Sequence, residues 1–391
     1  MPKTNPKAVI AGWGHTQFGR LEDQDTESLV LSAGRMALEH AGLPPCELEG
    51  IWLGQFEAGL DVGSFHSSLA LGIDPAMRFI PATRCENACA SGSAAIYAAR
   101  NAIAAGEVKT ALVIGVEKMT HRSTKEVAAC LARAAYAKEE GNLSFPQIFA
   151  EFAKAYFAEY GDCSDALAHI AAKNHRNALD NPLAHMRKDV GFAFCNTLSE
   201  KNPVIADPLR LTDCSLVTDG AAALVLVADD MRHAFPQAVE FRAAVQVNDF
   251  LPMSRRKLTD FAGPTKAIKD ACTAAGVDSK DLDFAEVHDC FTIAELLIYE
   301  AMGLAPKGQG RKAIDEGVVM ADGSLPVNRS GGLKAKGHPV GATGVSMHVM
   351  AAKQLTGQAG DLQLPGAELG LVFNMGGSAV ANYASILQPV A

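Results

Sequence analysis

The sequence lacks any long hydrophobic run, and neither end carries a recognisable targeting signal. Its longest uninterrupted apolar run, AAALVLVA at 221–228, has the length of a buried strand, whereas a membrane-crossing helix needs about 20 apolar residues. The beginning, MPKTNPKAVIAG, has no apolar core of the secretory type, and the end, QPVA, has no peroxisomal Ser-Lys-Leu-type address. We therefore expect a cytoplasmic protein without membrane insertion.

The sequence also has fewer basic than acidic residues. The 391 residues include 35 Lys and Arg against 44 Asp and Glu, which gives a formal net charge of −9. This balance argues against nucleic acid as the main partner, because phosphate backbones are bound by faces rich in Lys and Arg. It is compatible with a small polyanionic ligand held by a local basic patch. The length exceeds one small core and predicts two or three domains.

Cysteine is present but shows no metal or redox pattern. The nine cysteines include no Cys-x-x-Cys pair and no Cys/His run with zinc spacing. In a chain of this size and composition we expect reduced thiols, as in the cytosol.

An internal repeat is the first positive feature. AGLPPCELEG at 41–50 and AGVDSKDLDF at 275–284 each follow a helical pattern and precede a short apolar strand. Gly42 and Gly276 suit the C-terminal ends of the two helices. CASGSAAIYAARNAIAAG at 89–106 and HPVGATGVSMHVMAAKQLTG at 338–357 form a second matching pair, each a small-residue turn, a helix and then a strand.

The repeat predicts two related halves of βαβ type, each a mixed sheet flanked by helices. We assign residues 1–120 and 211–235 to the first half, with AAALVLVADD as its last strand, and residues 236–391 to the second half. Residues 121–210 are helix-like and charged, and we expect them to form an inserted loop or cap domain. A pseudo-twofold axis between the halves would place Cys89 and His338 at equivalent helix starts.

Cys89 stands among small residues in NACASGSAA, which let a backbone approach a ligand closely. At a helix N-terminus, the helix dipole would lower the pKa of its thiol and favour a nucleophile. A buried structural cysteine explains this segment equally well. His338 lies in the glycine-rich stretch GGLKAKGHPVGATG, where a side chain is poorly placed for core packing, and a functional role is the better interpretation. A phosphate-binding loop is disfavoured because Gly-Lys-Ser/Thr is absent.

His288 and Cys290 fall in AEVHDCFTIAELL, where a strand is expected to end and a helix to begin. Residues two apart on a strand share one face, so both could enter one cavity, and Asp289 would point the other way. A metal site would need further ligands at metal spacing, which the sequence does not supply. Taken alone, this segment fits a core His and Cys better than a site.

The C-terminal NMGGSAVANY supplies glycines, Gly376 and Gly377, that could place a backbone N–H against an oxyanion, although a tight turn explains them as well. A thiol nucleophile, two imidazoles, a second thiol and glycine-rich backbone together suit acyl transfer through a thioester, followed by formation or cleavage of a carbon–carbon bond.

With these segments in view, the chain resembles the thiolase superfamily over nearly its whole length. It is most similar to the sterol-carrier-protein-linked type, which has His-Asp-Cys-Phe where ordinary thiolases carry Asn-Glu-Ala-Phe. Ordinary thiolases also have Cys-x-Gly-Gly near the C-terminus, where this chain has Asn374 instead of the cysteine. The matching motifs, in order, are NACASGSAA, TALVIGVEKM, DCSLVTDGAAALVLV, EVHDCFTIAELLIYEAMGLAPKGQG, GGLKAKGHPVGATG and NMGGSA.

The resemblance implies a five-layered α/β/α/β/α fold from two halves plus a loop domain over the ligand, and a homodimer or homotetramer. It implies coenzyme A thioesters as substrates, with no metal or organic cofactor. Cys89 would be the acylated nucleophile, activated by His338. His338 and His288 would bind the enolate oxygen, and Cys290 would be the acid/base, a thiolate near pKa 7–8 serving as its base form. The backbone N–H groups of Cys89 and Gly376 would hold the acyl carbonyl.

Three alternatives remain open. A related C-acyltransferase could use a non-CoA acceptor and work with a small OB-fold protein, with a retro-aldolase as a variant that needs no nucleophilic cysteine. A non-catalytic relative that only binds CoA is disfavoured by the intact Cys and His set. For the CoA phosphates, the inserted segment offers Lys173, His175 and Arg176 as candidates, although solvated surface is the better interpretation of each one taken alone.

Overall fold

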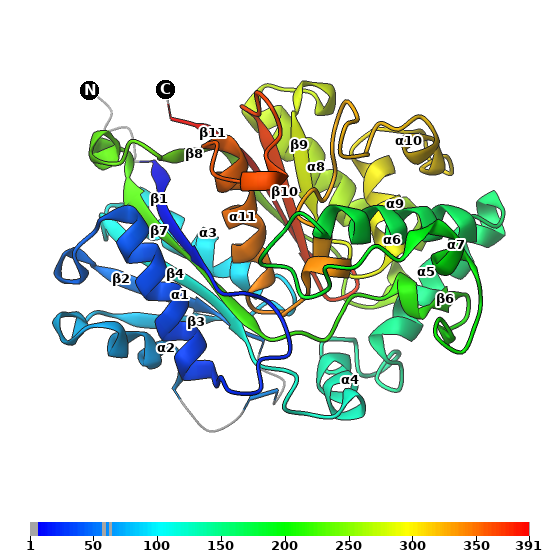
Figure 1. Ribbon diagram of the computed structural model, residues 1–391, viewed down its shortest axis with the longest axis horizontal. Coiled ribbons are helices and arrows are strands. Elements are labelled where there is room, and N and C mark those ends of the chain that lie inside the picture. Colours follow the sequence, from blue (N-terminus) through cyan, green and yellow to red (C-terminus); the bar gives the residue numbers. More distant parts are fainter. Residues whose placement is uncertain (1–6, 57–59, 62–64, 391) are drawn as a thin grey trace.

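The computed structural model describes residues 7–56, 60–61 and 65–390 (Figure 1). Within them, nine strands form one sheet in the order β3-β2-β4-β7-β1-β8-β11-β10-β9, and a separate two-stranded ribbon pairs β5 with β6. The large sheet joins its two halves through a short antiparallel contact in which Val9 and Ile10 face Glu240 and Val239.

The first half of the sheet contains β1 and β2 with their connecting helix, then β3, a second long helix, a strand parallel to β2 and a last strand that runs antiparallel. Its elements are β1 Ala8–His15, α1 Thr26–Ala41, β2 Gly50–Gly54, α2 His66–Leu69, β3 Ala82–Cys85, α3 Ser91–Ala105, β4 Thr110–Glu117 and β7 Gly220–Ala228. The run AAALVLVA lies inside β7, between β1 and β4, as expected for a buried strand.

The second half repeats this plan with β8 Val239–Asn248, α8 Ala262–Ala275, β9 Phe284–Val287, α11 Thr343–Leu355, β10 Gly370–Gly376 and β11 Ala381–Pro389. β2 pairs parallel with β4, as β9 does with β10. β7 then pairs antiparallel with both β4 and β1, as β11 does with β10 and β8. The internal repeat predicted from the sequence is therefore confirmed. β3 is an addition of the first half.

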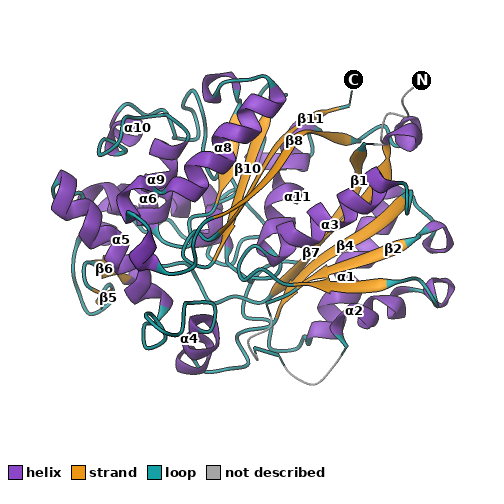
Figure 2. Ribbon diagram, turned by 180° about the vertical axis from the view of Figure 1, so that it is seen from behind, coloured by secondary structure: helices purple, strands orange, loops and turns teal. Residues whose placement is uncertain are grey.

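The layers follow from how the helices cover the sheet. α3 and α11 pack against each other between the two halves, while α1 covers the outer face of the first half and α8 that of the second (Figures 1 and 2). This is the predicted five-layered α/β/α/β/α arrangement. The predicted helix ends are also confirmed, because Gly42 and Gly276 adopt left-handed conformations with φ of 67° and 66° directly after α1 and α8.

Residues 121–210 are mainly helical, with α4 Thr124–Ala132, α5 Phe145–Tyr160, α6 Ser164–Ala178, α7 Gly191–Asn196 and the ribbon β5 Val204–Ala206 and β6 Leu209–Arg210. They lie against the second half (Figure 1), where α6 contacts α9 Thr292–Ala301 and the 332–336 turn. α10 Arg311–Asp315 follows α9. Among the described residues, no helix is both long and apolar enough to span a bilayer.

Candidate active site

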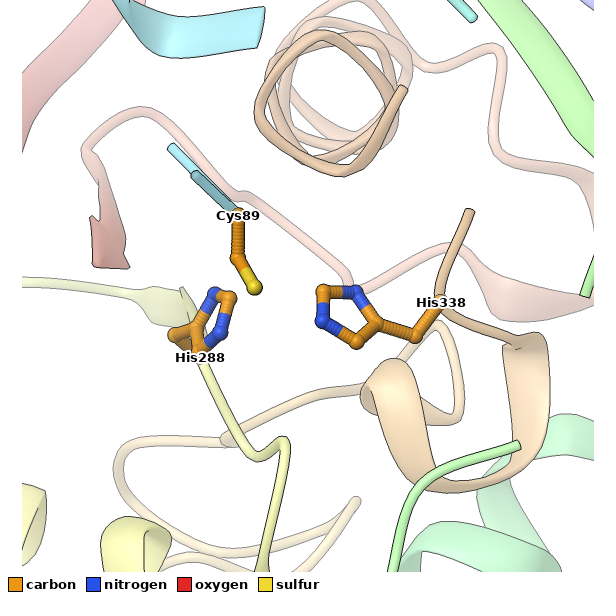
Figure 3. Close-up of side chains that lie close together, drawn as sticks. All are labelled: Cys89, His288 and His338. Carbon is orange, nitrogen blue, oxygen red and sulfur yellow. The ribbon is translucent and has the colours of Figure 1, made fainter. Parts of the chain in front are cut away.

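Four predicted side chains come together where the two halves meet. Cys89 precedes α3, His338 precedes α11, and His288 and Cys290 follow the end of β9. The ligand-type atoms of Cys89, His288 and His338 all lie within 4.8 Å of one another, and Figure 3 shows the sulfur between the two imidazoles. Segments about 200 and 250 residues apart in the chain thus build one cluster.

Cys89 is presented by a sharp turn between β3 and α3. Ala88 has a φ of 50°, in the left-handed region that side chains other than glycine seldom adopt. The turn is fixed because the Ser91 hydroxyl donates to the Ala88 carbonyl, at 2.6 Å, and accepts from the N–H of Asn87, at 2.9 Å. The strain is thus held locally, and the thiol projects into the cluster.

The thiol of Cys89 is a neutral group at rest. Burial raises its pKa to about 12, with a further increase from the charge of Glu117. The backbone N–H groups of Gly377 and of Cys89 itself act in the opposite direction by donating to the sulfur. The expectation that the helix start would lower this pKa is therefore wrong, because desolvation outweighs the favourable dipoles. A thiolate at Cys89 needs a base in contact.

His338 is placed to be that base. Its Nδ1 lies 2.7 Å from the Thr343 hydroxyl, which itself donates to the Pro339 carbonyl at 3.0 Å. Because the only hydrogen of the Thr343 hydroxyl is donated to the carbonyl, the hydroxyl must accept in its bond with His338. Nδ1 of His338 therefore carries a hydrogen. The free lone pair is therefore on Nε2. Burial, followed by the charge of Lys336, lowers the pKa of His338 to about 3, which keeps the imidazole neutral.

His288 has the opposite tautomer. The Asn374 side-chain nitrogen lies 2.8 Å from Nδ1 of His288 and 3.3 Å from the Cys89 carbonyl oxygen. A carbonyl only accepts, so this atom of Asn374 is the NH₂ group, and it donates to His288 Nδ1. Burial, with the nearby His338, lowers the pKa of His288 well below its usual value. A neutral His288 therefore carries its hydrogen on Nε2.

These tautomers bear on metal binding. Cys89, His288 and His338 are soft donors of the kind that hold Zn²⁺ in three-ligand catalytic sites. A metal at His288 would have to replace either the hydrogen on Nε2 or the bond from Asn374 to Nδ1. The two imidazoles are therefore better suited to hydrogen bonding than to metal binding, with His338 as the acceptor and His288 as the donor. Their ring planes lie at 85° and their centroids are 5.2 Å apart.

Cys290 opens into the same cavity as Cys89 and His338. Burial, followed by the proximity of Cys89, raises the pKa of Cys290 well above the usual value. The thiolate near pKa 7–8 expected from the sequence is therefore wrong for the resting state. A neutral thiol is suited to give a proton before it takes one.

Asp289 points away from the cluster, as the alternation along a strand predicted. It accepts the N–H groups of Leu333 and Lys334 at 2.6 and 3.1 Å, and the Asn174 side-chain nitrogen at 2.8 Å. Burial, then the nearby Glu295, raises the pKa of Asp289 to about 7. This carboxyl holds the single π-helical turn at 332–336, which carries the chain towards His338.

The glycine pair near the C-terminus lies beside the thiol. Gly377, whose φ is +65°, donates its N–H to the Cys89 sulfur, as does the N–H of Cys89 itself. Gly376 is the last residue of β10 and packs so tightly that a Cβ there would lie 2.2 Å from the Asn87 carbonyl. Gly376 still stands beside the site, and its N–H as a donor to an acyl carbonyl stays a prediction.

The three candidates for CoA phosphates lie on α6 and differ in environment. The Lys173 ammonium is buried, 2.9 Å from Glu295 and 2.7 Å from the Val327 carbonyl, and His175 is only 2% exposed. Neither can reach a bulky phosphate at the surface without unfolding its surroundings, so the prediction is wrong for both residues. Arg176 is solvent-exposed, with its guanidinium 3.1 Å from Asp189, and its contact with a CoA phosphate stays a prediction.

A largely apolar cavity of about 380 Å³ opens over Cys89, Cys290 and His338. Its walls combine α4, the start of α5, the ribbon and the 214–217 segment. Among the described residues, no Lys, Arg, Asp or Glu lines it. The apolar part of the wall is formed by Phe56, Met119, Val127, Leu131, Phe145, Ile205, Leu211, Leu216, Val217, Phe291 and Val340.

Two supporting residues were not assigned a role from the sequence. In the sequence, Asn374 stands out only as the replacement of a cysteine, and its contact with His288 depends on the register of β10 beside β9. Glu117 ends β4, and its carboxylate accepts the N–H groups of Phe56 and Gly341 at 2.9 and 3.1 Å. A buried carboxylate directly after the apolar run TALVIGV was the available signal.

Comparison with known proteins agrees with this geometry. Residues 8–230 match the family profile "Thiolase, N-terminal domain", and residues 245–389 match "Thiolase C-terminal domain-like". The chain therefore belongs to the thiolase family.

Sequence relatives narrow the class. The chain is 36% identical to an acetyl-CoA acetyltransferase of Methanothermobacter thermautotrophicus, over 95% of this chain and 96% of that protein. It is 31% identical to human sterol carrier protein 2, over 96% of this chain and 71% of that protein. At this level of similarity the chain is an acyltransferase of the thiolase type.

Solved structures share the fold. The Ltp2-ChsH2(DUF35) aldolase aligns with a TM-score of 0.82 at 22% identity, covering 98% of both chains. Human mitochondrial 3-ketoacyl-CoA thiolase in complex with CoA aligns with a TM-score of 0.76 at 17% identity, covering 99% of both chains. At these identities the likeness supports the architecture alone.

Proposed function

We propose that this protein catalyses thiolysis of 3-ketoacyl-CoA by CoA, or the reverse Claisen condensation, through an acyl-enzyme on Cys89. The observation that carries the proposal is the meeting of a thiol with one imidazole that can accept a proton and another that can donate a hydrogen bond. The second thiol, Cys290, lines the same apolar cavity.

The first half-reaction breaks the carbon–carbon bond. Nε2 of His338 takes the proton of Cys89, and the sulfur adds to the 3-keto carbon. The resulting oxyanion collapses to a thioester on Cys89, and the electron pair of the C2–C3 bond becomes the enolate of the released acyl-CoA. The Nε2–H groups of His288 and protonated His338 bind the enolate oxygen, and Cys290 gives its proton to the α-carbon.

The second half-reaction regenerates the enzyme. The Cys290 thiolate takes the proton of free CoA, and the CoA sulfur adds to the acyl carbonyl on Cys89. The Cys89 sulfur leaves and recovers its proton from His338. Each proton thus returns to its starting group, and each imidazole and thiol works from the neutral state that burial favours. The reaction as written requires no metal or organic cofactor.

The cavity bears on the acyl group. Its apolar walls and volume of about 380 Å³ suit acyl chains longer than acetyl, or the pantetheine arm beside a short acyl group. We propose acyl-CoA and CoA as substrates, Arg176 as a phosphate contact, and a homodimer or homotetramer as the assembly. The inserted segment 121–210 would be the cap that covers them.

A thiolysis assay with 3-ketoacyl-CoA of increasing chain length tests the proposal. We expect CoA-dependent cleavage, and mass spectrometry should detect an acyl group on Cys89 in wild type but not in Cys89→Ala. A chelator should leave the rate unchanged. The proposal is overturned by tight CoA binding without cleavage or acylation at any chain length, which is the behaviour of a non-catalytic relative.

A second candidate is acyl transfer to a non-CoA acceptor together with a small OB-fold protein. Exposed apolar side chains support it, since Leu198, Val204, Ile205 and Leu211 are 44–61% exposed, and two of them also line the cavity. A protein that co-purifies with the chain and is needed for its activity would favour this candidate. Cleavage that survives Cys89→Ala would instead indicate a retro-aldol reaction.

A further inference from the structure

We infer that Asn374 is a positioning residue that fixes the tautomer of His288 and thereby makes its Nε2–H available to the reacting oxygen. The inference rests on the proposed function, in which that oxygen belongs to an enolate. The resemblance to thiolases does not supply it, because the ordinary members carry a cysteine at this position and an asparagine in place of His288.

The side chain of Asn374 has one allowed orientation. Its nitrogen donates to Nδ1 of His288 at 2.8 Å and to the backbone carbonyl of Cys89 at 3.3 Å. Its oxygen accepts the Ser93 hydroxyl at 2.8 Å. If the amide were turned over, its oxygen would face the Cys89 carbonyl, which cannot donate. The backbone carbonyl of Cys89 thus determines the orientation of the Asn374 amide, and the amide determines which nitrogen of His288 is protonated.

Close packing prevents the amide from moving. Asn374 is fully buried in β10, and Ser93 is fully buried in α3. A Cβ added at Gly344 would lie 2.6 Å from the Asn374 oxygen and 2.4 Å from the Ser93 hydroxyl. The glycine that follows the His338 turn therefore leaves room for this pair, and a larger residue there would displace it.

The groups facing His288 explain why the amide matters. His338 stands across the cluster with its centroid 5.2 Å away, and Cys89 lies between the rings. Neither group fixes which nitrogen of His288 is protonated, because a thiol can either donate or accept, and the hydrogen bond described for the His288 ring is the one from Asn374 to Nδ1. Without a donor at Nδ1, the hydrogen of a neutral His288 is free to occupy either nitrogen.

Asn374→Asp provides the test, because a carboxylate can only accept. The Nδ1 of His288 must then carry the hydrogen, and the negative charge raises the pKa of the imidazole. At high pH the neutral ring loses its Nε2–H, whereas at lower pH the doubly protonated ring regains it. We expect kcat to fall by roughly 10²–10³-fold as pH rises through the new pKa of His288, the loss typical of one oxyanion donor. The kcat of wild type should show no such decrease with rising pH.

A direct readout separates this inference from the proposed activity. Nitrogen NMR with ¹⁵N-labelled histidine, assigned with His288→Gln, should show wild-type His288 protonated on Nε2 and the Asn374→Asp variant protonated on Nδ1 at high pH. Asn374→Ala guards against misfolding, and we expect it to lower kcat about tenfold with mixed tautomers. Asn382→Ala removes an equally buried amide of the next strand, whose bonds go to Ala379, Val380 and Val247 carbonyls, and should keep the His288 signal of wild type.

Two results would overturn the inference. One is an Asn374→Asp protein in which His288 keeps its hydrogen on Nε2 at high pH. The other is a kcat profile of that variant with the same pH dependence as wild type, which would mean that Asn374 only fills space. A wild-type protein without thiolase activity would overturn the proposed function instead, while the NMR comparison would still decide the tautomer.

Discussion

At the scale of single residues, the site is built from groups held in their neutral forms. Burial raises the pKa of Cys89 to about 12 and lowers that of His338 to about 3. An ion pair between them is therefore disfavoured before substrate binds, and in the proposed mechanism the proton would move only as the sulfur acquires an acyl carbon. Reactivity at Cys89 thus depends on contact geometry more than on a resting thiolate.

The proton shuttle is the residue-scale feature most open to test. If Cys290 exchanges the α-proton, Cys290→Ala should lose deuterium incorporation from D₂O into acetyl-CoA and lower thiolysis by roughly 10²–10⁴-fold, the usual range for a general acid or base. Mass spectrometry of the recovered acetyl-CoA measures the exchange. Cys272→Ala, which alters a buried cysteine of α8, is the control and should exchange like wild type. Full exchange in Cys290→Ala would show that another group carries the proton.

At the scale of elements, the site depends on how closely α3 and α11 approach each other. A Cβ at Gly92 would lie 2.8 Å from the Gly341 carbonyl, and one at Gly344 would lie 2.4 Å from the backbone nitrogen of Ser93. Small residues at the start of both helices therefore permit the two helix N-termini, with Cys89 and His338 just before them, to face one another. These small residues belong to the small-residue turns that the two segments share in the sequence.

Gly344→Ala tests this contact. The added methyl group meets backbone and a buried hydroxyl that cannot move aside, and we expect the free energy of unfolding in urea to fall by about 1–3 kcal/mol, the usual cost of overpacking. Thiolysis should decrease as well, because the helices that carry the site must separate. Gly19→Ala is the matched control, since its Cβ would meet only Leu21 at 3.6 Å. A Gly344→Ala protein as stable and active as wild type would refute the packing argument.

At the scale of the whole molecule, much titratable chemistry is buried between the layers. Burial lowers the pKa of His15 to about 3 and that of His348 to about 4, while it raises the pKa of Asp289 to about 7 and that of Glu117 well above its usual value. The two kinds of group act in opposite directions. A histidine with a lowered pKa costs stability as pH falls below 6.5, and a carboxyl with a raised pKa costs stability as pH rises towards its folded value.

His348→Gln isolates one of these contributions. His348 is held by the Gly344 carbonyl and the Ser385 hydroxyl, and its folded pKa of about 4 lies below the unfolded value of 6.5. Between pH 6.5 and 4 the unfolded chain therefore binds one more proton at this residue. The stability of wild type should fall relative to the variant by about 1.4 kcal/mol for each pH unit in that range. Urea unfolding at several pH values measures both curves, and parallel curves would contradict the assignment.

Much of the architecture could be read from the sequence because it is written in local patterns. Gly42 and Gly276 mark equivalent helix ends, and the strand run at 221–228 is apolar throughout because both of its faces are covered. The alternation of side chains along His288, Asp289 and Cys290 correctly predicted that Asp289 points away from the other two. These features depend on neighbours a few residues away, which is the range over which a sequence pattern is informative.

The rest was decided by contacts between distant segments. The sequence suggests a surface cation at Lys173, but the packing of α6 buries this side chain against Glu295. The helix start at Cys89 suggests a lowered thiol pKa, but burial has the larger effect and raises it. The partner of His288, Asn374, comes from a neighbouring strand 86 residues later. The sequence by itself determined which residues could do the chemistry and in what order they occur. Only the tertiary structure determined their protonation, because desolvation and hydrogen-bond partners depend on the packing of the two halves.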